Sequence, residues 1–230
     1  MKKRLLALVL ALLPVLLLSV ACKKDEPLED DLPQEEIQTP DYYDAGTVEG
    51  SLTWEIHSDG TLYVKGTGAM SDLITSAEQG ENQQPWATYS AAIKRVVVED
   101  GVTRLSQLSF KRCTNLTEVV LGRGITSIPT ECFANCYALK KIEAKGVTVL
   151  EECALENCLR LEVLTVSASL ERVEQGALGG SCTEGAGLTL KLAGTAAELE
   201  QARVVLRLAD PEHSEKVLAD AMENVSFVEK

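Results

Sequence analysis

The cysteines are the residues of this sequence most able to do chemistry. The first function to consider for them is metal binding. The chain has seven cysteines among 230 residues. Cys132 precedes Cys136 by four positions, and Cys153 precedes Cys158 by five. Four thiolates form a ligand set that zinc accepts. Neither spacing is the short one typical of zinc knuckles, so we expect no metal at these positions.

Disulfides are the second possibility. Four cysteines recur at intervals of 22–24 residues: Cys113, Cys136, Cys158 and Cys182. On neighbouring coils of a repeat structure, strands about 4.8 Å apart would bring such residues within disulfide range. Cys132 and Cys153 could pair in the same way. Free cysteine is also among the most deeply buried residue types, so we favour buried thiols and keep disulfides as the alternative.

The two histidines give little support for catalysis. His57 lies beside a predicted hairpin turn and His213 in a predicted terminal helix, and neither has a nucleophile motif next to it. The G-x-S-x-G elbow, the phosphate-binding loop and H-E-x-x-H do not occur. We therefore predict a protein that is not an enzyme and needs no cofactor. The alternative is an unrecognised hydrolase, which would require acidic residues gathered with a histidine in a pocket.

A repeat of about 23 residues organises the middle of the chain. Four segments carry apolar residues at matching places, and each ends in cysteine: 91–113, 114–136, 137–158 and 159–182. Within each, a stretch such as Val96–Val98 alternates like a short strand. A single repeat cannot bury its apolar face alone. Stacked repeats would form a parallel sheet over one continuous core.

These residues resemble the BspA-like, or Treponema-type, leucine-rich repeat family. The second segment carries the likeness best, with Leu116–Leu121, Ile125–Ile128 and Phe133–Cys136 in the places of the family pattern. Gly122 stands where the family has proline, and the third and fourth segments lack the aromatic residue before the cysteine. The resemblance implies a mainly β leucine-rich repeat solenoid with short helical or irregular segments.

The predicted N-terminal cap is a β-hairpin within residues 48–90. Leu52–Ile56 and Thr61–Gly66 flank Ser58-Asp59-Gly60, which favours a tight turn. Together with Trp86, this stretch resembles the segment that opens many proteins of the family. We expect Trp54 and Trp86 in the core of this cap rather than on a sugar-binding platform.

Residues 183–230 are predicted to form an α+β C-terminal cap. A strand is expected at Leu188–Leu192 and a last strand around Val225–Val228. Thr195 with Glu198 fits a capping box at the start of a helix. A second, amphipathic helix is expected from Glu215 to Met222.

The N-terminus resembles an export signal. Residues 1–21 combine a basic head with an apolar run shorter than the ~20 residues of a membrane-spanning helix, as in a secretory signal peptide. Ser19–Cys22 resembles the lipobox of bacterial lipoproteins, which implies that Cys22 is acylated and anchors the chain in the membrane. Lys24-Asp25-Glu26 resembles the surface-export signal of Bacteroidota lipoproteins. We expect an outer membrane lipoprotein on the cell surface, with a periplasm-facing location as the alternative.

Charge limits the partners. The chain has 22 basic and 35 acidic side chains, for a net charge of −13, and would repel DNA or RNA. Aromatic residues make up only 4%, too few for a platform that stacks single-stranded bases. Residues 22–47 are rich in acids and proline and are predicted to form a disordered, extended tether.

The remaining candidate site is a surface. If Val96, Val98 and their equivalents point inward, their neighbours point outward on the face of the sheet. The candidate binding face comprises Arg95, Val97, Glu99, Glu118, Val120, Lys141, Glu143, Lys145, Val163, Thr165 and Ser167. We expect Val97, Val120 and Val163 to form an apolar line at its centre. Repeat faces commonly bind proteins, so we predict adhesion to a protein or cell-surface ligand, or, alternatively, a scaffold for another envelope protein.

Overall fold

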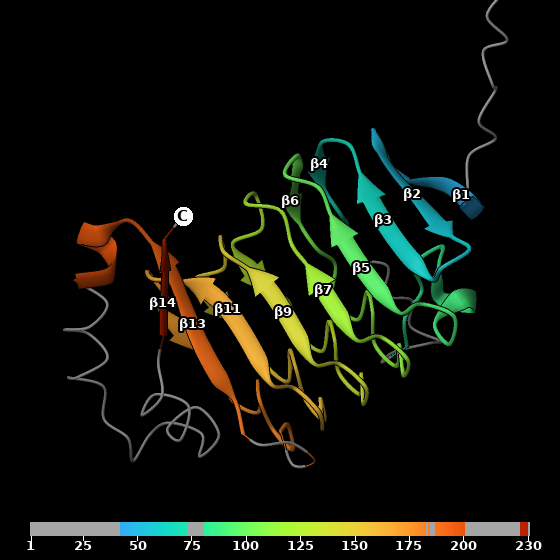
Figure 1. The fold of residues 1–230 in the computed structure, drawn as a ribbon. Coiled ribbons are helices and arrows are strands. Elements are labelled where there is room, and N and C mark those ends of the chain that lie inside the picture. Colours follow the sequence, from blue (N-terminus) through green and yellow to red (C-terminus); the bar gives the residue numbers. More distant parts are fainter. Residues whose placement is uncertain (1–41, 73–80, 183, 185–186, 201–225, 230) are drawn as a thin grey trace, which may run out of the picture. The chain divides into compact units, whose positions relative to one another are not determined.

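The computed structural model describes residues 42–72, 81–182, 184, 187–200 and 226–229, and its main element is one long sheet (Figure 1). Nine strands form it in the order β1-β2-β3-β5-β7-β9-β11-β13-β14. Their bounds are Tyr42–Glu49 (β1), Leu52–His57 (β2), Thr61–Lys65 (β3), Arg95–Val98 (β5), Glu118–Val120 (β7), Lys141–Ala144 (β9), Val163–Ser167 (β11), Thr189–Gly194 (β13) and Ser226–Glu229 (β14). The first three strands are antiparallel, and from β3 onward every neighbour is parallel.

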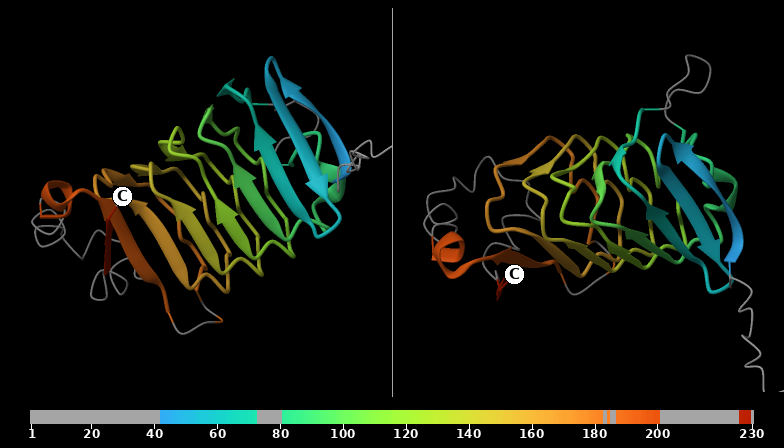
Figure 2. Two further views of the ribbon diagram at one scale, coloured as in Figure 1. Left: turned by 45° about the horizontal axis from the view of Figure 1, so that its top comes forward. Right: turned by 90° about the horizontal axis from the view of Figure 1, so that it is seen from above.

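Shorter strands form two further sheets, on another side of the coils that the chain makes. β8 (Ser127–Ile128), β10 (Val149–Leu150) and β12 (Arg172–Val173) form a parallel three-stranded sheet, and β4 (Gly68–Ala69) pairs with β6 (Val102–Arg104). Figure 2 shows the chain returning to each sheet once per coil. The predicted leucine-rich repeat solenoid is therefore confirmed.

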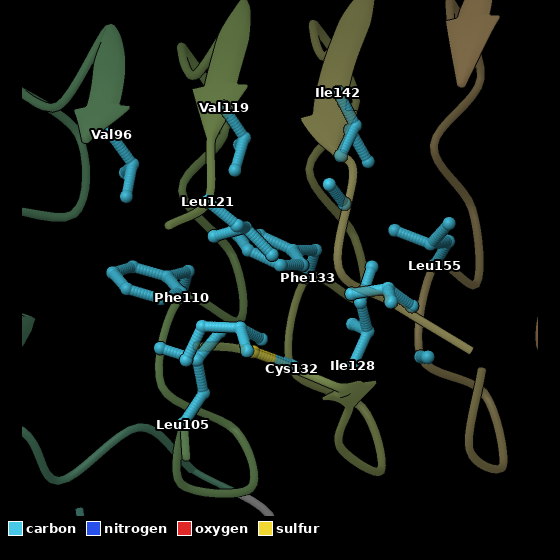
Figure 3. Close-up of a cluster of buried hydrophobic side chains, with 14 of the residues drawn as sticks. Val96, Leu105, Phe110, Val119, Leu121, Ile128, Cys132, Phe133, Ile142 and Leu155 are labelled. Carbon is cyan, nitrogen blue, oxygen red and sulfur yellow. The ribbon is translucent and has the colours of Figure 1, made fainter. Parts of the chain in front are cut away.

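The core runs through the inside of the coils without a break. Val96, Val119 and Ile142 come from successive long strands and are fully buried, as the alternation predicts. Figure 3 shows Phe110 and Phe133 between the two sheets, among aliphatic side chains of the same coils. Their rings stack with centroids 5.1 Å apart and planes 8° apart.

Each coil closes through two residues in the left-handed backbone conformation. The pairs are Leu108 and Arg112, Glu131 and Asn135, Cys153 and Asn157, and Gly176 and Gly180. The two members of a pair are four positions apart, so the turn has the same shape in every coil. Asparagine and glycine adopt this conformation at low cost.

This turn corrects the alignment of the fourth repeat. Gly180 is the equivalent of Asn157, so the next residue, Ser181, takes the place of Cys158. The Ser181 hydroxyl donates to the Leu155 carbonyl at 2.5 Å, the same bond that the Cys158 thiol makes to Phe133 of the preceding coil. Cys182 therefore lies outside the cysteine position, and it is partly exposed. A hydroxyl can replace the thiol because both are small groups that donate one hydrogen bond.

The N-terminal hairpin is confirmed, with one addition. β2 and β3 pair across the predicted turn, and Trp54 and Trp86 are buried in the cap. Residues 42–47, assigned by the sequence to the tether, belong to β1, which pairs with β2. Gly46 allows this approach, because a Cβ there would lie 2.8 Å from the Trp54 Nε1.

The C-terminal cap agrees with its expected elements where the structure describes them. Strands β13 and β14 lie close to the predicted positions. The Thr195 amide donates to the Glu198 carboxylate at 2.7 Å and the Glu198 amide to the Thr195 hydroxyl at 3.3 Å, which confirms the capping box. Residues 196–200 are helical. The predicted helix at Glu215–Met222 lies outside the described residues.

Candidate binding face

Among the residues that the structure describes, the cysteines and His57 are not gathered into one chemical site. In the described part of the chain, no group of three or more His, Cys, Asp and Glu residues is placed to hold a metal ion. Cys132, Cys136 and Cys158 are buried thiols, and Cys153 is partly exposed. His57 lines a pocket and contacts the Glu55 carboxylate at 2.7 Å, but no carboxylate lines that pocket, so it does not gather acids with a histidine as a hydrolase would need. His213 lies outside the described residues.

The outer face of the sheet carries two rows of side chains, which the strand register defines. The first row contains Arg95, Glu118, Lys141 and Val163 on successive strands, and we call it the charged row. The second contains Tyr63, Val97, Val120, Glu143 and Thr165, and we call it the valine row. The candidate residues thus come together on one surface, in an order that only the register reveals.

The charged row is paired within itself. The Arg95 Nε lies 3.1 Å from Glu118, and the Lys141 Nζ lies 3.3 Å from Glu118. Lys141 also lies 2.6 Å from Glu143, in the valine row. The hydrogen bond with Glu143 raises the pKa of Lys141 and lowers the pKa of the Glu143 carboxyl. Two cations and two anions make this part of the face electrically neutral.

The predicted line of three valines is wrong. Val97 and Val120 are register neighbours, but Val163 pairs with Lys141 and belongs to the charged row. In the parallel register, each residue of β11 lies beside one residue of β9. Val163 and Thr165 are two positions apart on β11, so they point to the same face but belong to different rows. Thr165 occupies the place that Val163 was expected to have.

Thr165 is not an exposed member of the face. It is only 4% exposed, and Ser167 is also buried. The register places Thr165 between Glu143 and Lys191, so two long side chains flank a short one. Glu99 and Lys145 lie just beyond the ends of β5 and β9, at the border of the face.

The aromatic end of the valine row was not predicted from the sequence. Tyr63 lies beside Val97; its ring centroid is 4.9 Å from that of His57 and 5.1 Å from the Lys65 Nζ. Glu55 accepts hydrogen bonds from Lys65 at 2.6 Å and contacts His57 at 2.7 Å, and both lower its pKa. Alternation along Thr61–Lys65 indicates that Tyr63 faces outward, and this was the available signal.

Residues 86–188 match the family model for the BspA type leucine rich repeat region, in six copies. The period of the apolar residues predicts four units over 91–182. A search of curated proteins found no match. In the described residues, no helix has the length and apolar character needed to cross a membrane.

Two solved structures are similar to the chain. A leucine-rich repeat protein from Eubacterium ventriosum is 20% identical with a TM-score of 0.46, and the match covers 64% of this chain and 43% of that one. A leucine rich cell surface protein from Faecalibacterium prausnitzii is 16% identical with a TM-score of 0.30, over 64% and 54% of the two chains. The chain therefore spans about half or less of the length of these structures.

Proposed function

Because residues 86–188 form a BspA-type leucine-rich repeat region, we propose that the protein is a binding and adhesion module of the bacterial cell surface. Its ligand would be a protein or another component of a cell surface. The repeat family points to a non-enzymatic protein, and the proposal includes no catalytic step. The acylated Cys22 would hold the repeats at the outer membrane.

The observation that carries this proposal is the outer face of the nine-stranded sheet. Tyr63, Val97 and Val120 form a partly exposed apolar row, bordered by the paired charges of Arg95, Glu118 and Lys141. An apolar centre with a polar rim is the usual build of a protein interface.

The charge balance of the face also supports binding. The whole chain has a net charge of −13, which would repel an acidic partner at long range. The charged row and Glu143 contribute two cations and two anions, which lie in contact. This part of the face therefore adds no net charge of its own where it meets a partner.

The test uses intact cells of the native bacterium, with the gene deleted and restored as wild type or variant. Val120→Asp places a charge in the apolar row and should reduce adherence to epithelial cells or to neighbouring bacteria about tenfold, or ~1.4 kcal/mol. Val163→Asp is the matched control, because it introduces the same charge on the same face but in the charged row. We expect its adherence to stay within about twofold of wild type.

Equal surface amounts and equal melting temperatures of the two variants would show that folding is not the cause. If Val120→Asp cells adhere like wild type, or if both variants lose adherence equally, the valine row is not the binding site.

A further inference from the structure

A pocket of about 500 Å³ lies in the N-terminal cap, and the proposed adhesion face does not use it. Its walls come from the β2–β3 turn, from the short 3₁₀ helix Ala87–Tyr89, and from the segment that leads into β5. Ile56, Ala91 and Ala92 supply apolar surface. Tyr43, His57 and Lys94 are the largest side chains with polar atoms that line it.

Tyr43 is an unusual residue at this pocket. It is 72% exposed, and Tyr137, at 44%, is the other exposed large hydrophobic side chain in the described residues. The Tyr43 ring packs edge-on against Tyr89, with centroids 5.9 Å apart and planes at 84°. The Tyr89 hydroxyl in turn donates to the Asp44 carboxylate. Tyr89 is therefore held in place, and it supports an aromatic ring that stays open to solvent.

The lining of the pocket contains the cation Lys94. No carboxylate lines it, and Lys94 makes no ion pair with any acid in the described ranges. Its side chain passes close to Gly60, where a Cβ would lie 3.1 Å from the Lys94 Cγ. The ammonium group is thus a cation available to a ligand.

The acids nearest in sequence are already engaged. Asp44 accepts a hydrogen bond from Tyr89. Asp59 accepts hydrogen bonds from the Thr61 amide at 2.7 Å and hydroxyl at 3.0 Å. Glu55 is held by Lys65 and His57. Asp44 and Asp59 keep their negative charge, but their oxygens are held by these donors and neither residue lines the pocket, so Lys94 is the cation in its lining.

We propose that this pocket binds a carboxylated sugar, such as a uronic or sialic acid residue of a glycan. The C–H groups on one face of a pyranose ring carry partial positive charge and pack on the negative face of an aromatic ring, here Tyr43. The sugar carboxylate pairs with Lys94, and its hydroxyls lie among the polar groups of His57 and Thr88. A mostly apolar pocket with a few polar groups is the usual form of a small-ligand site.

The experiment measures sugar binding by the full mature chain, purified from membranes in detergent, with saturation-transfer NMR and calorimetry. The probes are glucuronate and N-acetylneuraminate, with glucose and galactose as their neutral counterparts. We expect both acids to bind about tenfold or more tightly than the neutral sugars. If neither acid binds, or if the neutral sugars bind equally well, the proposal is wrong.

Four variants locate the site. Tyr43→Ala should weaken binding of the acids about tenfold, whereas Tyr43→Phe, which keeps the ring, should bind like wild type. Lys94→Gln should abolish the preference for acids over neutral sugars. Tyr137→Ala removes the other exposed tyrosine and should have no effect. Unchanged binding by Tyr43→Ala would overturn the assignment.

This proposal stands apart from the adhesion face. Val120→Asp should leave sugar binding unchanged, since Val120 lies on the outer face of the sheet and does not line the pocket. A loss of sugar binding in this variant would contradict the placement of the site in the pocket.

Discussion

A single small residue connects each coil to the one before it. The Cys136 thiol donates to the Phe110 carbonyl at 3.2 Å, and the Cys158 thiol to the Phe133 carbonyl at 3.4 Å. Ser181 makes the corresponding bond in the next coil. The position therefore requires a small buried side chain with one proton to donate, and cysteine meets this need without forming a disulfide.

Burial of the thiols predicts a loss of stability at high pH. It raises the pKa of Cys113 to about 12 and holds the pKa of Cys132, Cys136 and Cys158 well above the ordinary value. In the unfolded chain these thiols would titrate near pH ~8.5. The folded state keeps the thiol protons at a higher pH than the unfolded chain does. The stabilisation that the thiols contribute is therefore fully present below about pH 8.5 and is lost as the pH rises toward the folded-state pKa.

Urea unfolding under reducing conditions measures this effect. Between about pH 9 and pH 11, each such thiol should lower the free energy of unfolding by ~1.4 kcal/mol per pH unit. Cys136→Ala removes one of them and should give a slope that is shallower by that amount. Equal slopes for the variant and the wild type would contradict the prediction.

At the scale of elements, a stack of aromatic rings holds the first coils together. Trp86 stacks on Phe110 with centroids 5.5 Å apart, and Phe110 stacks on Phe133. Leu155 continues the same position in the next coil. The stack thus changes from aromatic to aliphatic where the repeats depart from the family pattern.

The stack should contribute much more to stability than the ion pairs on the outer face. Phe133→Ala leaves a cavity in the core and should cost ~3–5 kcal/mol of unfolding free energy. Phe133→Leu, the residue type of the next coil, should cost less, since much of the buried volume is kept. Glu118→Gln breaks exposed ion pairs and should cost at most ~1 kcal/mol.

Urea unfolding at neutral pH compares the three variants. If Phe133→Ala costs no more than Glu118→Gln, the aromatic stack is not a main source of stability.

At the scale of the whole molecule, the proposed lipid anchor and surface display can both be tested on cells. Protease treatment of intact cells of the native host should digest a surface-anchored protein rapidly while a periplasmic control survives. Cys22→Ser removes the proposed site of acylation, and the variant should leave the membrane fraction. Protection of the wild-type protein until the outer membrane is opened would contradict surface display and favour an envelope scaffold.

The periodic spacing of apolar residues was enough to predict the solenoid. Which residues are inside depends on local alternation, and this is why Val96, Val119 and Ile142 were assigned correctly. The β2–β3 hairpin and the capping box at Thr195 are also local, since turn and cap residues act on their own neighbours.

Only the tertiary structure decided which residues lie side by side. Val163 belongs to the charged row and Ser181 to the cysteine position because strand pairing and turn geometry fix each residue against another coil. The pocket joins Tyr43 to Tyr89 and Lys94, which are more than 40 positions away in the sequence. Such neighbours depend on how one strand pairs with another. The alternation of residues within a single strand does not determine that pairing.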